Sequence, residues 1–360
     1  MHNESLHGIG GKLPRLTVSS DVRQRKLPDE YTGIKMIQLT TKSANRMRIS
    51  TSEGASSIVS GAITYVEKLN SEAEARWADK LQVDNSLTRA MVSFQANKGK
   101  AVYRWFKYKE AFSAGLVEHL LSRYRIDKGT VLDPFSGSGT ALFAAGGLGM
   151  KAEGIELLPI GQTVIATKQL IDWELRDTDV KRLVFWRDER PWEKSKTAKP
   201  ISELRITRGA YPAETLEAMG RFLVVSEQEG RRVKAVLLFA LLCILESISY
   251  TRKDGQYLRW DYRSGRRRGK KIFDKGEILS FDKAITNKLH EMVADLCSAD
   301  VPEDLFATAR SKAEIKLHGG SCLNILPKLT TESYDGLITS PPYCNRYDYT
   351  RTYALELALL

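Results

Sequence analysis

The sequence has 360 residues, 42% hydrophobic and 28% charged, which suffices for one large folded domain with an insertion and excludes a disordered chain. The formal net charge of +11 favours a polyanionic partner such as nucleic acid. The longest apolar run, residues 235–245, falls short of the ~20 residues of a membrane helix, and Cys and His lack zinc-ligand spacing. We therefore expect no membrane span and no metal site. The absence of a secretory leader and of framework cysteines favours the cytoplasm.

Two contrasting segments precede the first predicted strand. Residues 1–56 are rich in Ser, Thr, Lys and Arg and have few apolar positions in register, which predicts a flexible basic arm. Residues 101–124 instead combine aromatic side chains with the apolar periodicity of an amphipathic helix. We expect this helix to lead directly into the first strand.

Four short apolar segments have the composition of buried parallel strands, and they lie at residues 130–133, 152–157, 314–318 and 335–340. Residues 140–149 and 158–170 suit the crossover helices of such a sheet. The alternation of strand and helix predicts an α/β fold with a doubly wound, mostly parallel sheet.

Residues 171–313 are far too many for a connection inside a compact α/β unit, so we expect an insertion with its own structure. The apolar periodicity is helical at 213–229, 232–250 and 281–299. A mostly helical, basic insertion is therefore predicted.

Within this insertion, residues 251–275 interleave Arg and Lys with aromatic side chains. Such a mixture suits phosphate contacts, base contacts by Arg and stacking of displaced bases, whereas a solvated loop is the alternative. The candidate DNA-binding residues are Arg252, Lys253, Arg259, Trp260, Arg263, Arg266, Arg267, Arg268 and Lys270.

A glycine-rich turn, DPFSGSGT at 133–140, follows the first predicted strand. Gly137 and Gly139 permit close backbone approach to a ligand, and the free N–H groups of the next helix suit an anionic group. Glu156 ends the second strand, where an acid can accept hydrogen bonds from ribose hydroxyls. Leu142 stands where a dinucleotide fingerprint has its third glycine, which argues against NAD and leaves S-adenosylmethionine. A ligand-free turn is the alternative for this loop alone.

A second block, TSPPY at 339–343, ends the fourth predicted strand. Pro341 and Pro342 hold the backbone extended, so their carbonyls project in fixed directions. An exocyclic base amine has a delocalised lone pair, and two acceptors that grip its protons orient that lone pair towards an incoming methyl group. Ser340 and the Pro341 carbonyl can be those acceptors, and Tyr343 would stack on a flipped base. A strand-terminating loop with a surface tyrosine is the alternative.

DPFSGSGT and TSPPY resemble motifs I and IV of the DNA amino-methyltransferases, which make N4-methylcytosine or N6-methyladenine, and FKYKEAFSAGLVEHLL at 106–121 resembles motif X. The resemblance covers about a third of the chain and implies a Rossmann-like fold that binds S-adenosylmethionine. Ser321 stands where motif III often has an acid, and a Ser at position 340 is commoner among the cytosine-N4 enzymes. The implied cofactor-binding residues are Phe112, Ser113, Asp133, Phe135, Gly137, Gly139, Thr140, Glu156 and Ser321.

By this resemblance, residues 57–170 form the first part of a methyltransferase domain with motifs X, I and II, and residues 314–360 form the second part with motifs III and IV. No sequence follows Leu360 for later strands, so we expect a truncated product or one half of a split enzyme that a second polypeptide completes. The expected partners are double-stranded DNA and, in restriction-modification or phage defence, a cognate endonuclease. RNA base methylation and a non-catalytic DNA-binding subunit are the alternatives.

Overall fold

The structure is a computed structural model that describes residues 63–72, 75–76, 84–254, 257–266, 272–297, 313–342 and 348–360. The chain divides into two compact units, residues 1–82 and 83–360. The described residues of the first unit are helical, and the predicted arm at 1–56 lies outside the described residues. In the described part of the chain, no helix is long and apolar enough to cross a membrane.

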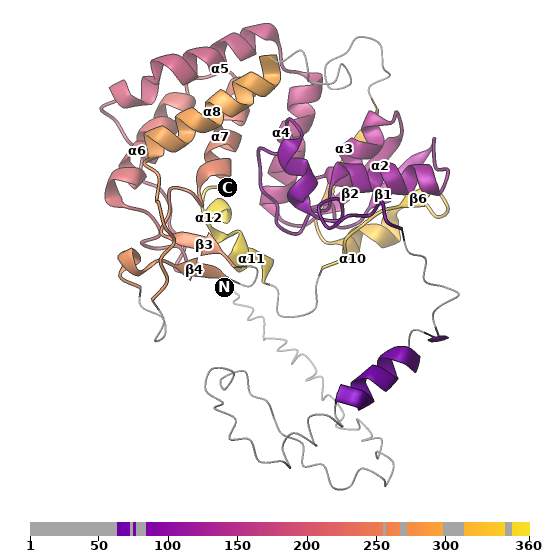
Figure 1. Ribbon diagram of the computed structural model, residues 1–360. Helices are drawn as coiled ribbons and strands as arrows, with labels where there is room; N and C mark the ends of the chain where they lie inside the picture. Colours follow the sequence, from indigo (N-terminus) through magenta and orange to yellow (C-terminus); the bar gives the residue numbers. More distant parts are fainter. Residues whose placement is uncertain are drawn as a thin grey trace, which may run out of the picture. The chain divides into compact units, whose positions relative to one another are not determined.

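The second unit combines a parallel sheet with a group of helices (Figure 1). The strands of the sheet are β1 (Thr130–Asp133), β2 (Lys151–Glu156), β5 (Ile315–Gly319) and β6 (Gly336–Leu337). The helices near it are α2 (Ala114–Arg123), α3 (Thr140–Gly147), α4 (Pro159–Trp173) and the short α10 (Cys322–Ile325). The remaining elements are α5 (Asp177–Glu189), α6 (Ala213–Ser226), α7 (Arg231–Ile244), β3 (Thr251–Lys253), β4 (Leu258–Trp260), α8 (Phe281–Cys297), α11 (Tyr349–Thr352), α12 (Ala354–Leu357) and the 3₁₀ turns η2 (Phe94–Gly99), η3 (Pro191–Lys194), η4 (Tyr262–Ser264) and η5 (Leu326–Lys328).

The strand order is β5-β2-β1-β6, and each neighbouring pair is parallel. This arrangement confirms the predicted α/β fold with a Rossmann-like parallel sheet. The fourth strand is shorter than the predicted 335–340, although the Ile338 N–H still donates to the Leu132 carbonyl at 3.1 Å. All four strands point the same way, so the ends of β1, β2 and β6 that carry Asp133, Glu156 and Thr339 lie at one edge of the sheet.

Helix α3 packs on β1 and β2, α4 packs on β2 and β5, and α2 packs against α3 (Figure 1). Alternation along a strand puts every second side chain on one face of the sheet, and Val131 of β1 and Ala152 of β2 are both fully buried there. They join Val117, Leu142 and Ile165 in one apolar cluster. The glycine-rich turn between β1 and α3 is thus anchored on a packed core.

The region 171–313 is mostly helical, as predicted, with one antiparallel hairpin, β3–β4, among its described residues. Helix α5 was not expected, because its sequence is strongly charged and few of its residues are buried. The core of this region also includes Trp105, Phe106, Tyr353 and Leu355. Residues on both sides of the insertion therefore contribute to its core.

Candidate cofactor and base-methylation site

A cavity of about 370 Å³ lies at the carboxyl ends of β1, β2 and β6. The segment before α2, the glycine-rich turn, the end of β2, the start of α10 and the segments on either side of residues 343–347 all line it. Of the residues expected in the site, it brings together Phe112, Asp133, Phe135, Gly137, Thr140, Glu156, Ser321, Ser340 and Pro342. Segments far apart in the sequence therefore meet in one pocket.

The charged side chains among the described lining residues of this cavity are all acidic. Its lining includes the acids Glu110, Asp133, Glu156 and Asp348, and no Lys, Arg or His is found among the described lining residues. Aromatic rings of Tyr108, Phe112, Phe135 and Tyr349 contribute apolar surface. Such a lining favours a cationic ligand with a flat apolar part over a ligand that carries phosphates.

Glu156 holds the glycine-rich turn in place. Its Oε2 accepts a hydrogen bond from the Gly137 N–H at 2.7 Å, and its Oε1 accepts one from the Leu158 N–H at 2.7 Å. Gly137 and Gly139 adopt φ values of 53° and 77°, in the left-handed region that glycine tolerates. Burial raises the pKa of Glu156 to about 7, although the two backbone hydrogen bonds oppose the shift.

Asp133 links the two sequence blocks directly. The Thr339 hydroxyl donates to Asp133 Oδ1 at 2.7 Å, and the Phe135 N–H donates to the same oxygen at 3.1 Å. Burial raises the pKa of Asp133 to about 6, since these hydrogen bonds only partly offset the loss of hydration. The end of β1 and the start of TSPPY are therefore fixed relative to each other.

The segment before α2 is fixed by an asparagine that sequence reasoning missed. The Asn97 amide donates to the Phe112 carbonyl at 3.0 Å, and its oxygen accepts from the Ala114 N–H at 3.0 Å. Ser113 caps α2, accepting from the Leu116 N–H at 3.1 Å and donating to the Met91 carbonyl at 2.5 Å. Both residues orient the chain so that Phe112 lines the cavity, while Ser113 itself does not line it.

Two further glycines make room for the turn, and the sequence pattern did not single them out. A Cβ on Gly161 would lie 2.6 Å from both Glu156 Cγ and the Gly137 carbonyl oxygen. A Cβ on Gly154 would lie 2.3 Å from Ser136 Oγ. Such close approaches depend on tertiary packing and leave no local signal in the sequence.

A buried lysine donates a hydrogen bond to the glycine-rich turn. Lys168 of α4 is only 3% exposed, and its Nζ donates to the Ser138 carbonyl at 3.0 Å. It also lies 5.0 Å from the ring centre of Tyr103 and 5.2 Å from that of Phe143. Burial lowers the pKa of Lys168 to about 8.

Some expected site residues lie elsewhere. Gly139 forms the N-cap of α3 and does not line the cavity, and Pro341 is exposed beside it. Tyr343, the expected stacking residue, lies outside the described residues. The structure thus places Ser340 and Pro342 at the cavity but does not place the tyrosine.

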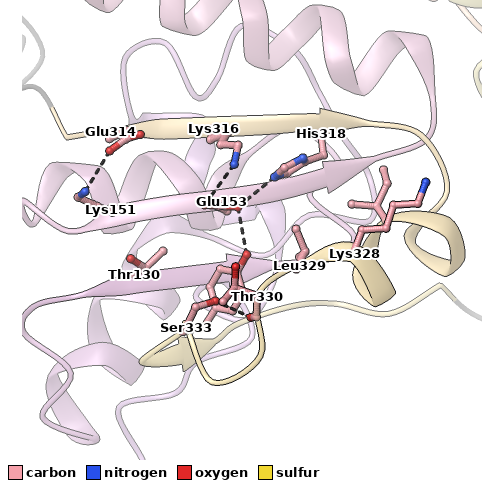
Figure 2. A pocket seen from close by; sticks show the side chains of 12 residues that line it. Thr130, Lys151, Glu153, Glu314, Lys316, His318, Lys328, Leu329, Thr330 and Ser333 are labelled. Atoms are coloured by element: carbon pink, nitrogen blue, oxygen red, sulfur yellow. Dashed lines mark hydrogen bonds and ion pairs between the residues drawn. The ribbon is translucent and has the colours of Figure 1, made fainter.

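A second hollow, of about 520 Å³, is lined by residues of β2 and β5 whose side chains project from the sheet, and Figure 2 shows its polar lining. Glu153 accepts a hydrogen bond from the Tyr334 hydroxyl at 3.0 Å and lies 3.0 Å from His318 Nε2. Lys316 lies 3.7 Å from the same carboxyl group. Glu153 and Glu156 differ by an odd number of positions and therefore project from opposite faces of β2. This hollow is separate from the acidic cavity.

The basic hairpin, residues 251–266 and 272–275, carries arginines on aromatic rings. The guanidinium carbons of Arg252 and Arg259 lie 5.4 and 4.1 Å from the ring centre of Phe273, and that of Arg266 lies 4.2 Å from Trp260. Arg252 and Arg259 are exposed, whereas Arg266 is half-buried and donates to the Ile206 and Arg205 carbonyls.

Lys253 and Arg263, of the predicted DNA-binding set, form close ion pairs with acids of the protein. Lys253 is 5% exposed and forms an ion pair with the buried Glu356, so its charge does not reach the surface. We therefore remove Lys253 from the set. Arg263 forms a two-pronged ion pair with Asp261 and also donates to the Gly276 carbonyl, which leaves it little freedom to bind DNA. Arg267, Arg268 and Lys270 lie outside the described residues.

Comparison with known proteins gives a consistent assignment. Residues 26–160 match the model of a DNA methylase family. The Type II methyltransferases M.AvaI of Nostoc sp. and of Anabaena variabilis are each 52% identical over 299 residues, which make up 83% of this chain and 62% of the relative. The Type II methyltransferase M.BsoBI of Geobacillus stearothermophilus is 37% identical over 312 residues, 82% of this chain and 59% of the relative. This chain thus spans less than two thirds of these relatives. No solved structure matches it.

Proposed function

Since this chain belongs to the DNA amino-methyltransferase family, we propose that its acidic cavity binds S-adenosylmethionine and that Ser340 presents the exocyclic amine of a DNA base to it. The observation that carries the proposal is the cavity at the strand ends, which places Glu156 and the glycine-rich turn beside Ser340. The match to this chain covers 62% of the M.AvaI relatives, so the activity of a whole protein of this kind is itself part of the proposal.

The lining of the cavity supports this cofactor. S-adenosylmethionine is a nucleoside whose sulfonium and ammonium groups are cationic, and the four acids of the lining complement that charge. Glu156 remains able to accept from ribose hydroxyls, because each carboxylate oxygen has a second lone pair beside the one that binds a backbone N–H. The pyrophosphate of NAD would meet the same carboxylates and be repelled. The bound cofactor supplies an electrophilic methyl group.

The residues of the chain would position the base that receives the methyl group. Ser340 Oγ and the Pro341 carbonyl accept the two amine protons of a flipped base and turn its lone pair towards the cavity. As the amine gains the methyl group, the sulfonium would leave as a neutral thioether, and the amine would lose one proton to solvent. The serine at position 340 supports N4 of cytosine over N6 of adenine. The hydrogen bond from Thr339 to Asp133 keeps this acceptor array in register with the cofactor turn.

Duplex DNA would contact the exposed arginines of the basic hairpin. Arg252 and Arg259 lie over the ring of Phe273 and are exposed, and part of each guanidinium already contacts the protein, at the Lys275 carbonyl and at Asp254 respectively; their remaining N–H groups would bind phosphates. The Type II relatives also support a role in restriction-modification, with a cognate endonuclease as partner.

The test of the catalytic role is Ser340→Ala, with Ser333→Ala as a matched control in the second hollow. We expect the rate of methyl transfer from labelled S-adenosylmethionine to DNA, measured in single turnover, to fall ~10²-fold for Ser340→Ala with cofactor affinity retained. Ser333→Ala should behave as wild type. An unchanged rate for Ser340→Ala would overturn the role of this serine.

The test of the cofactor assignment is a pair of binding titrations on the unaltered chain. We expect S-adenosylmethionine to bind with one site and NAD not to bind at the same concentration. Equal binding of the two ligands, or binding of NAD alone, would refute the assignment.

A further inference from the structure

Glu110 lies in the segment before α2 and lines the acidic cavity. Its Oε2 accepts a hydrogen bond from the Tyr353 hydroxyl at 2.6 Å. Tyr353 is fully buried, and its ring stacks on that of Tyr108 with 5.0 Å between the ring centres. Tyr108 lines the cavity as well, so one carboxylate oxygen of Glu110 is held in a fixed position at the cavity wall.

The other oxygen of Glu110 is buried and has no hydrogen-bond partner among the described residues. A buried acceptor without a partner is costly, so such an atom in a ligand cavity points to a donor that the ligand supplies. Among the described side chains that line the cavity, Glu110 is the one with a buried polar atom that lacks a hydrogen-bond partner.

The other acids of the cavity are already engaged by protein donors. Glu156 accepts from two backbone N–H groups, one at each oxygen. Asp348 accepts from Thr350 at one oxygen and pairs with Arg351 at the other. Asp133 accepts from both Thr339 and Phe135 at Oδ1, and its Oδ2 is not among the buried atoms without a partner. Among the acids that line the cavity, Glu110 is therefore the one whose buried oxygen lacks a donor within the described residues.

We propose that Glu110 binds the α-ammonium group of the amino-acid part of S-adenosylmethionine, and that Tyr353 is a positioning residue for it. This inference rests on the proposed function of the cavity. An ammonium group carries three donors and a positive charge, so it can satisfy the free oxygen of Glu110 and retain donors for other acceptors.

The experiment compares two ligands by calorimetric titration of the full 360-residue chain. S-adenosylhomocysteine retains the α-ammonium group, whereas 5′-methylthioadenosine has the same nucleoside without the amino-acid part. The variants are Glu110→Gln, which keeps the shape and removes the charge, and Tyr353→Phe. Glu118→Gln is the matched control, because Glu118 lies on α2 away from the cavity lining and pairs with Lys100.

We expect Glu110→Gln to weaken the binding of S-adenosylhomocysteine at least ~tenfold, as the loss of a hydrogen bond to a charged group does. The affinity for 5′-methylthioadenosine should stay unchanged. Tyr353→Phe should weaken the binding of S-adenosylhomocysteine by a smaller factor and leave the affinity for 5′-methylthioadenosine unchanged. If Glu110→Gln does not fold, Tyr353→Phe still distinguishes the two ligands. Glu118→Gln should match wild type for both ligands.

Unchanged affinity of Glu110→Gln for S-adenosylhomocysteine would overturn the inference and leave the proposed function intact. An equal loss for both ligands would also overturn it, since it would show a structural role for Glu110. If the wild-type chain binds neither ligand, the proposed cofactor fails together with the inference.

Discussion

Replacing Gly161 with Ala tests whether the packing beneath the glycine-rich turn controls cofactor binding. The added Cβ would lie 2.6 Å from both Glu156 Cγ and the Gly137 carbonyl oxygen, so both groups, or the backbone of residue 161 itself, must move until each contact is longer by roughly 0.8 Å. Overpacking of this kind costs about 1–3 kcal/mol, whereas alanine in place of glycine in α4 returns up to about 1 kcal/mol through helix propensity. We expect the free energy of unfolding to fall by at most about 3 kcal/mol.

Gly161→Ala should also weaken cofactor binding at least ~tenfold, because the displaced groups are the acid and the backbone that form the binding turn. Urea unfolding followed by tryptophan fluorescence measures the stability, and calorimetric titration with S-adenosylmethionine measures the affinity. Gly147→Ala is the matched control, since Gly147 ends α3 and a Cβ there would meet nothing within 4 Å. It should gain about 0.5–1 kcal/mol of stability and bind the cofactor normally. Wild-type affinity in Gly161→Ala would refute the reasoning.

Three further predictions concern charges around the site. Burial raises the pKa values of Glu156 to about 7 and Asp133 to about 6, and a cationic ligand lowers them, so binding of S-adenosylmethionine at about pH 6.5 should release protons and release fewer above about pH 8. Titrations in buffers of different ionisation enthalpy measure this, and proton uptake would contradict it. Lys168→Met should weaken cofactor binding about three- to tenfold because the Ser138 carbonyl loses its donor, whereas Lys168→Arg should retain part of the affinity through its own hydrogen bond. Equal affinity in the wild type and both variants would show that Lys168 does not support the cofactor turn. The double variant Arg252→Gln with Arg259→Gln should reduce the slope of log K, the association constant for DNA, against log salt concentration by about 1.8. The control Arg231→Gln changes an exposed arginine of α7 outside the hairpin and should alter the slope by no more than half of this. An unaltered slope in the double variant would show that the hairpin does not bind DNA.

The sequence was informative where structure is determined locally. Strand 130–133 was predicted to the residue, because an apolar run ends in Asp133 and Pro134 and a glycine turn follows. The strand ends then brought Glu156 and Ser340 together, since parallel strands share one carboxyl edge.

Contacts over long sequence distances escaped the same reasoning. Lys253 lies in a basic run that is typical of surface charge, yet its partner Glu356 is more than a hundred residues further along the chain. Gly161 and Asn97 have no neighbouring pattern that marks them, because their roles depend on what packs against them in space. Helix α5 was missed since its apolar stripe is narrow, with Leu183 and Trp186 as its buried hydrophobic residues.

The central claim is most directly tested by identifying the methylated nucleoside. The protein would be incubated with labelled S-adenosylmethionine and with duplex DNA or structured RNA, and the digested nucleosides would be separated and identified by mass. The account predicts label in DNA as N4-methylcytosine. Label in RNA alone, or in 5-methylcytosine, would contradict it.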